Sequence, residues 1–117
     1  MVEIDSSEEQ DAIAGHMSSL ELRHKDFWIG LHDIDQEGDW VWYISQRPVD
    51  AGFINWAPGS PDDYEQKEDC ATLININGEW NPAKWGDVPC SSYRHALCER
   101  GGCSGIRLLI LDRYRCR

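Results

Sequence analysis

The sequence has few basic residues and no long apolar segment. It carries 11 Lys and Arg against 21 Asp and Glu, which gives a formal net charge of −10. Because contact with nucleic-acid phosphates requires a basic surface, this balance argues against a nucleic-acid partner and favours cations or basic proteins. No apolar run approaches the ~20 residues that a helix needs to cross a bilayer, so no membrane span is predicted.

Motifs of several enzyme and calcium-binding classes are also missing. No serine lies in a nucleophile elbow, no Gly-rich phosphate loop occurs, and the EF-hand pattern is absent. Glycosidases use two carboxyl groups, but nothing here distinguishes an acid from a base, which disfavours that class. We therefore predict a protein without enzymatic activity.

Five cysteines are present, and an odd count leaves one thiol over. Cysteines at this density in a small domain indicate an oxidising, secreted setting. The opening residues 1–5 lack the basic and apolar regions of a signal peptide, so either a leader is missing or the compartment inference is wrong. Zinc at Cys90, His95 and Cys98 lacks an obvious fourth ligand, and we interpret these cysteines as half-cystines.

Local patterns predict one domain of mixed secondary structure. Ser6 and Glu9 have the spacing of a capping box, which predicts a helix over roughly 7–18. Asn77-Gly78 is a strong hairpin signal. Strands are expected at 27–31, 40–42, 70–76 and 93–99, and loops at 32–39, 57–69 and 81–87. Trp28, Trp40 and Trp42 lie in strand-like runs and are assigned to the core. Trp80 and Trp85 flank a predicted loop, and the sequence does not decide whether they belong to the core or to a binding surface.

The segment GSPDDYEQKEDC, residues 59–70, concentrates negative charge in a loop. A second acidic cluster comprises Asp33, Asp35 and Glu37, and Asp87 lies in a third loop. Such loops are either solvated or hold a cation, and the pattern by itself favours neither. Calcium is the cation considered, because it prefers six to eight oxygen ligands in a flexible shell. The segment's five carboxylates belong to Asp62, Asp63, Glu65, Glu68 and Asp69.

An ordered set of landmarks resembles the C-type lectin-like domain across residues 2–99. They are Trp28-Ile29-Gly30-Leu31, Asn55-Trp56, Pro61, Glu68-Asp69-Cys70, Trp85-Gly86-Asp87-Val88-Pro89-Cys90 and Ala96-Leu97-Cys98-Glu99. The resemblance implies an α+β fold with small antiparallel sheets, a flanking helix and a long calcium-binding loop region. It also implies Ca²⁺ as the cofactor and, as in many members, calcium-dependent sugar binding.

The family's sugar site implies a second role for part of the acidic loop. Its tripeptide, Glu-Pro-Asn or Gln-Pro-Asp, corresponds here to Ser60-Pro61-Asp62, whose third position matches the galactose-type version. The matching side-chain ligands are Asp62, Glu68 and Asp87. Ser60 and Gly86 depart from the pattern, and Ser60 offers only a hydroxyl. The resemblance also implies a cis bond before Pro61.

The family's auxiliary calcium site matches the sequence at every side-chain position. Repulsion among these carboxylates would be strong without a cation. Asp35 and Glu65 have no role in either site and are interpreted as solvated. The auxiliary ligands fall on Asp33, Glu37, Asp63, Glu68 and Asp69.

The resemblance also implies a disulfide between Cys70 and Cys90. Cys98 matches a cysteine whose partner lies in a first helix, and this chain is interpreted as lacking that helix and the strand before it. Cys103 or Cys116 remains as its alternative partner.

Composition shifts at residue 100, which divides the chain into a lectin-like domain, 1–100, and a basic tail, 101–117. Residues 1–100 carry 20 Asp and Glu against 7 Lys and Arg, whereas the tail carries four Arg and one Asp. The apolar run 106–111 either substitutes for the missing helix or is an aggregation-prone extension, and the second is favoured slightly.

We expect a secreted, calcium-dependent carbohydrate-binding module that prefers galactose-type sugars. The residues expected to bind the sugar are Ser60, Asp62, Glu68 and Asp87. The alternative is an extracellular protein-interaction module of the same fold that binds calcium but has lost sugar binding.

Overall fold

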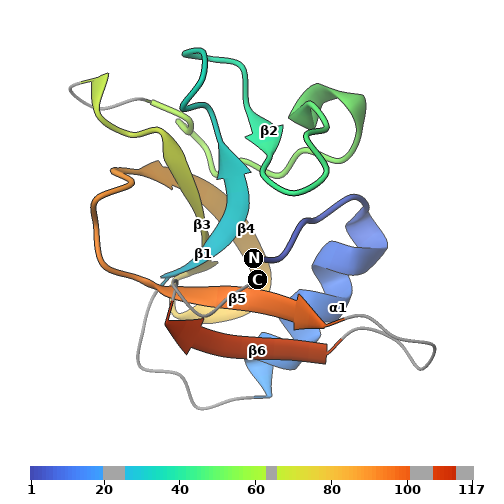
Figure 1. Ribbon diagram of the computed structural model, residues 1–117. Coiled ribbons are helices and arrows are strands. Elements are labelled where there is room, and N and C mark those ends of the chain that lie inside the picture. The colour runs from blue at the N-terminus through green and yellow to red at the C-terminus, as the bar shows by residue number, and fades with distance from the viewer. Residues whose placement is uncertain (20–25, 63–65, 101–106, 113–117) are drawn as a thin grey trace.

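The computed structural model describes residues 1–19, 26–62, 66–100 and 107–112. Predictions that involve Asp63, Glu65, Cys103 or Cys116 lie outside these residues. The elements are α1 (Ser7–Ser18), β1 (Asp26–His32), β2 (Val41–Trp42), the 3-10 helix η1 (Val49–Ala51), β3 (Cys70–Ile76), β4 (Glu79–Val88), β5 (His95–Arg100) and β6 (Arg107–Asp112). Figure 1 shows α1 beside the sheet, with β5 and β6 below the remaining strands.

Helix α1 begins where the capping pattern predicts. Ser6 has extended backbone angles, and its hydroxyl accepts a hydrogen bond from the Glu9 backbone N–H at 3.1 Å. The buried Gln10 then ties the helix to β4, because its amide donates to the Ala83 carbonyl at 3.4 Å and accepts from the Trp85 indole at 3.1 Å. The predicted helix over 7–18 is confirmed.

The described strands form one curled sheet in the order β4-β3-β1-β5-β6, with β2 also paired to β1. All pairs are antiparallel except β1 with β5. The residues before α1 run between these two strands, since Val2 donates to Leu97 and accepts from Gly30, both at 2.8 Å. A Cβ at Gly30 would lie 3.2 Å from the Val2 carbonyl, which explains the glycine there. The predicted α+β class with a flanking helix is confirmed, but the described strands form one sheet rather than the expected small antiparallel sheets.

The β3–β4 hairpin is longer than the sequence indicated. Asn77 and Gly78 both have positive φ, at 54° and 82°, as a two-residue hairpin turn requires. The predicted loop at 81–87 is wrong, because β4 continues to Val88. Pro82 is tolerated because β4 is an edge strand whose register with β3 shifts there, from Ile76 opposite Glu79 to Asn75 opposite Ala83.

The core is built around tryptophans, as predicted for Trp28, Trp40 and Trp42, all of which are buried. Trp80 and Trp85, left open by the sequence, are buried as well. Trp85 lies at the centre, with edge-to-face contacts to Trp42 at 5.5 Å between ring centroids and to two further rings. Such contacts contribute about 0.5–1.5 kcal/mol each beyond the burial of apolar area.

Part of the basic tail continues the sheet. β6 pairs antiparallel with β5 through six consecutive residue pairs, from His95 opposite Asp112 to Arg100 opposite Arg107. The position of β6 as the last strand of the sheet is visible in Figure 1. The described part of the apolar run is therefore an added strand.

Candidate functional site

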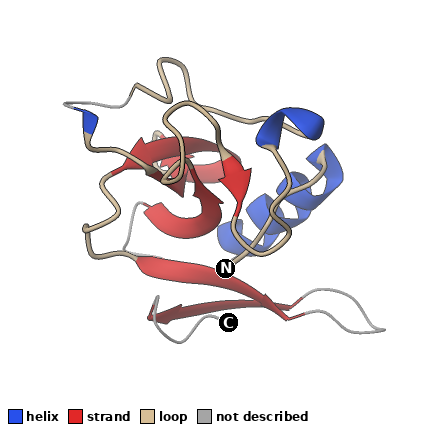
Figure 2. Cartoon of the chain, turned by 45° about the horizontal axis from the view of Figure 1, so that its top comes forward, coloured by secondary structure: helices blue, strands red, loops and turns tan. Residues whose placement is uncertain are grey.

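Two groups of carboxylates assemble where β1 and β4 end and β3 begins. β1 ends at His32 opposite Cys70, the first residue of β3, and Asp87 near the end of β4 lies opposite Ala71. The first group contains Asp33, Glu37 and Asp69, and the second contains Asp62, Glu68 and Asp87. Within each group, one oxygen from every carboxylate lies within 4.8 Å of the others. Figure 2 shows that the long irregular segments gather at the end of the molecule away from β5 and β6.

Backbone contacts fix the first group, which we call the auxiliary cluster. The Asp33 N–H donates to the Asp69 carbonyl at 3.0 Å, so the two residues lie side by side beyond the paired strands. One carboxylate oxygen of Asp33 accepts from the Gly38 N–H at 2.9 Å, which folds the intervening loop back. Gly38 has φ of 86°, a conformation that favours glycine.

The auxiliary cluster is buried in part, and two of its carboxylate oxygens have no hydrogen-bond donor among the described residues. Asp33 is 1% exposed, and the Oδ1 atoms of Asp33 and Asp69 are buried without a hydrogen-bond partner in the described structure. Burial raises the pKa of Asp69, the neighbouring Asp33 carboxyl raises it further, and contact with Glu37 acts in the opposite direction. Buried oxygens that lack donors and belong to an all-oxygen group match the ligand preference of calcium.

The second group, the ligand cluster, is held by a contact between a loop and a strand. The backbone N–H of Asp62 donates to both carboxylate oxygens of Asp87, at 3.2 and 3.0 Å. Asp87 is buried in β4, whereas Asp62 is exposed. The Ser60–Pro61 bond between this loop and the preceding turn is cis, which confirms the expectation from the resemblance.

The loop reaches Asp87 because its start pairs with the edge of β4. The Trp85 N–H donates to the Asn55 carbonyl at 3.0 Å, and the Ala57 N–H donates to the Trp85 carbonyl at 2.8 Å. Sequence analysis missed this attachment. The sequence gives no signal for it, because the partner strand β4 falls where a loop is predicted, at 81–87.

Adjacent residues serve different clusters. Glu68 lies with Asp62 and Asp87, whereas Asp69 lies with Asp33 and Glu37. The expected participation of Glu68 in both sites remains a prediction, and so does the role of Asp63, which lies outside the described residues. Asp35 belongs to neither cluster, in agreement with its interpretation as solvated.

The predicted disulfide between Cys70 and Cys90 is confirmed, with 5.0 Å between the two Cα atoms. It joins the residue after Asp69 to the segment that follows β4, and so holds the ends of the site together. Cys98 is also disulfide-bonded, and its two candidate partners lie outside the described residues. Both findings support the half-cystine interpretation over zinc.

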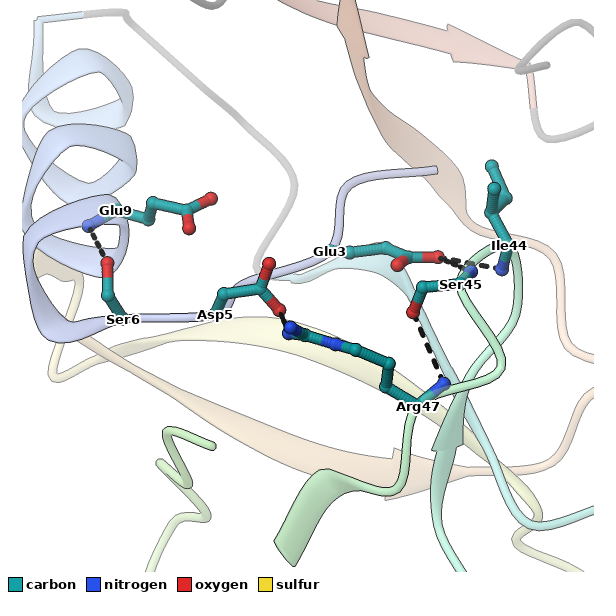
Figure 3. Close-up of polar contacts among 7 residues, drawn as sticks. All are labelled: Glu3, Asp5, Ser6, Glu9, Ile44, Ser45 and Arg47. Atoms are coloured by element: carbon teal, nitrogen blue, oxygen red, sulfur yellow. Dashed lines mark hydrogen bonds and ion pairs between the residues drawn. The ribbon is translucent and has the colours of Figure 1, made fainter. Parts of the chain in front are cut away.

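An apolar surface beside the auxiliary cluster was not predicted. A cavity of about 240 Å³ is lined by residues that include Ile34, Tyr43, and the paired Cys70 and Cys90. Ile34, Tyr43 and Ile44 are exposed, and we call these three side chains the apolar patch. The segment 43–47, which carries Tyr43 and Ile44, is held by the N-terminal segment (Figure 3). The Glu3 carboxylate accepts from the Ile44 N–H at 2.7 Å, and Asp5 pairs with Arg47.

Comparison with known proteins gives a consistent match over most of the chain. Residues 1–100 match the family model described as the Lectin C-type domain. The low affinity immunoglobulin epsilon Fc receptor of Mus musculus is 40% identical over 101 residues, covering 86% of this chain and 26% of the receptor. Salivary C-type lectin 2 of Aedes albopictus is 32% identical over 90 residues, covering 77% of this chain and 58% of that protein. The chain therefore spans only part of both relatives.

Solved structures agree with the sequence match. The C-type lectin CEL-I of Cucumaria echinata has a TM-score of 0.66 at 27% identity, covering 79% of this chain and 61% of that one. The carbohydrate-recognition domain of the mouse scavenger receptor C-type lectin has a TM-score of 0.63 at 31% identity, covering 97% of this chain and 70% of that one. With the family model matching residues 1–100, the chain belongs to the C-type lectin domain family.

Proposed function

We propose that this domain binds carbohydrate through a calcium ion held by the ligand cluster. C-type lectin domains are typically carbohydrate-binding and non-enzymatic, and they usually bind calcium. The observation that carries the proposal is the convergence of Asp62, Glu68 and Asp87 within 4.8 Å. These residues come from two distant segments, yet their carboxylates share one point, as ligands of a single cation must.

The chemistry of this cluster suits recognition of a sugar. A calcium ion bound by three carboxylates keeps coordination positions for two vicinal hydroxyl groups, since calcium takes six to eight oxygens. Carboxylate oxygens that hold the ion also accept hydrogen bonds from those hydroxyls, and such charge-assisted bonds are the stronger kind. Asp62 is the third residue of the Ser60-Pro61-Asp62 tripeptide and matches the galactose-type version, which supports a preference for galactose-type sugars.

The auxiliary cluster takes a second calcium ion in this proposal. Asp33, Glu37 and Asp69 supply its carboxylates, with Asp63 and Glu68 as further ligands. Its support is the pair of buried carboxylate oxygens without donors. An ion there neutralises the cluster and fixes the loop that also carries Glu68.

An extracellular location completes the proposal. The Cys70–Cys90 disulfide supports it, because disulfides persist mainly in oxidising compartments. No helix among the described residues combines the length and apolar character that crossing a membrane requires.

A glycan array with calcium and with EDTA tests the function. Binding to terminal galactose-type glycans is expected with calcium and should disappear with EDTA. Asp62→Ala, at an exposed residue, should remove binding because it deletes a ligand oxygen, whereas Asp35→Asn should leave it unchanged because Asp35 joins neither cluster. Absent binding, or binding that EDTA does not affect, contradicts the proposal.

A protein-interaction module that binds calcium is the second candidate. Two features favour it: Ser60 and Gly86 offer less than the family's ligands, and two side chains of the apolar patch, Ile34 and Tyr43, line a cavity of about 240 Å³. Exposed apolar groups gathered around a hollow commonly mark protein-binding surfaces. The ligand in that case is an extracellular protein.

A further inference from the structure

The two edges of the sheet are built differently. β4, at one edge, contains Pro82 and a register shift, and the backbone of residues 55–57 pairs with its Trp85. Proline, bulges and covering loops are the features by which proteins block pairing between sheet edges. The β4 edge is therefore protected against a further strand.

β6, at the other edge, has none of these protections among the described residues. Its six residues pair with β5 in an unbroken register, and they include neither proline nor lysine. No described strand pairs with its outer side. Figure 1 shows β6 as the outermost of the strands, beside β5. A regular, unblocked edge of this kind is a template for pairing with another chain.

The sequence of β6 is complementary to itself in one orientation only. It reads Arg-Leu-Leu-Ile-Leu-Asp, with opposite charges at its two ends and four aliphatic residues between them. In antiparallel pairing with a second copy about a twofold axis, Arg107 lies opposite Asp112 of the other copy, and Leu109 lies opposite Ile110. Parallel pairing in register instead places Arg107 opposite Arg107, and like charges directly opposite are unfavourable.

We propose that β6 forms a homodimer by pairing antiparallel with β6 of a second copy of this chain. The twofold axis passes between Leu109 and Ile110, so both copies make the same contacts, as in an isologous interface. This register places Arg107 of one copy opposite Asp112 of the other at each end of the paired strands. Since the pairing uses the β6 edge of each copy and the β4 edges are protected, assembly stops at the dimer.

Sedimentation of the full chain and three charge variants tests the dimer. The wild type is expected to show a monomer–dimer equilibrium. Arg107→Asp places two carboxylates opposite each other at both ends, and Asp112→Arg does the same with two cations. Each single reversal should weaken dimerisation about tenfold or more, because each removes two attractive cross-strand pairs and adds two repulsive ones. The double reversal restores both pairs and should restore the dimer.

Several outcomes overturn the proposal. These are a monomeric wild type at every concentration, a dimer that neither reversal weakens, a double variant no better than the singles, and open-ended aggregates without a discrete dimer. Far-UV circular dichroism shows that each variant is folded. If one single variant misfolds, the other single variant and the double variant still decide the matter.

Discussion

The backbone N–H of Asp62 donates to both carboxylate oxygens of Asp87, across 25 residues of sequence. This contact joins an exposed loop to a buried strand position without using the side chain of Asp62. Asp87 therefore has two separable roles, as an acceptor that positions the loop and as a charge for a cation. Variants at Asp87 distinguish the two roles.

Asp87→Asn keeps an acceptor oxygen for the Asp62 N–H, whereas Asp87→Ala removes it. We expect both variants to lose calcium-dependent sugar binding, since both remove the charge. The alanine variant should lose more stability in EDTA, by about 1–3 kcal/mol, because it leaves the Asp62 N–H without an acceptor, whereas the asparagine oxygen still accepts. Urea unfolding and glycan binding measure the two effects. Wild-type sugar binding by the asparagine variant would contradict the assigned role.

Calcium should stabilise the domain through the auxiliary cluster. An ion that binds only the folded state raises the free energy of unfolding by about 2.7 kcal/mol when its concentration is about 100 times Kd. Asp33→Asn should reduce this gain, because Asp33 is buried within the cluster. Asp35→Asn is the matched control from the same loop and should keep the full gain. Thermal unfolding with calcium and with EDTA measures both, and an Asp33→Asn variant that keeps the full gain would remove Asp33 from the site.

Local signals predicted the elements that short-range physics determines. Ser6 caps α1 at the expected place, and Asn77-Gly78 forms the hairpin turn with both φ angles positive. The extent of β4 could not be predicted in this way, because Pro82 and Gly86 both indicate a break. Tertiary structure overrides both signals, because β4 lies at the edge of the sheet, where Pro82 is tolerated, and pairs with β3 along most of its length.

The candidate site was predictable in composition and only partly in arrangement. The sequence placed Asp33 with Glu37 and Asp69, and the structure brings these three together. It did not indicate that Asp62 donates through its backbone to Asp87, because such a contact depends on how residues 55–57 pair with β4. The apolar patch likewise results from loop positions that no periodic pattern encodes.

The pKa of Asp69 predicts how pH affects the calcium-free protein. Burial, the largest cause, raises this pKa above the ordinary value of 3.8, so ionising Asp69 costs folding stability. That cost is complete above the raised pKa, and it disappears as pH falls toward 3.8. In EDTA at neutral pH, Asp69→Asn should therefore be more stable than wild type, and the difference should narrow on acidification.

Saturating calcium should reverse the order of these two proteins. The wild type then gains binding energy that Asp69→Asn has lost with its carboxylate. Urea unfolding at several pH values, with EDTA and with calcium, provides the comparison. An Asp69→Asn variant that is less stable than wild type in EDTA at neutral pH would show that the carboxylate stabilises the fold without an ion.

The double variant Ser60→Gln, Gly86→Asn distinguishes the two candidate functions. It supplies the two side chains that the family's sugar site has and this chain lacks. A Cβ at Gly86 would lie 3.6 Å from Ile74 Cδ1, an ordinary contact, so there is room for a Cβ at this position. If the wild type is a sugar-binding module, the variant should bind the same glycans more tightly in calcium; if it is a protein-binding module, the variant should acquire sugar binding. Glycan affinities of both proteins decide between these, and Ser60→Ala, Gly86→Ala is the control, since it adds no ligand and should improve nothing.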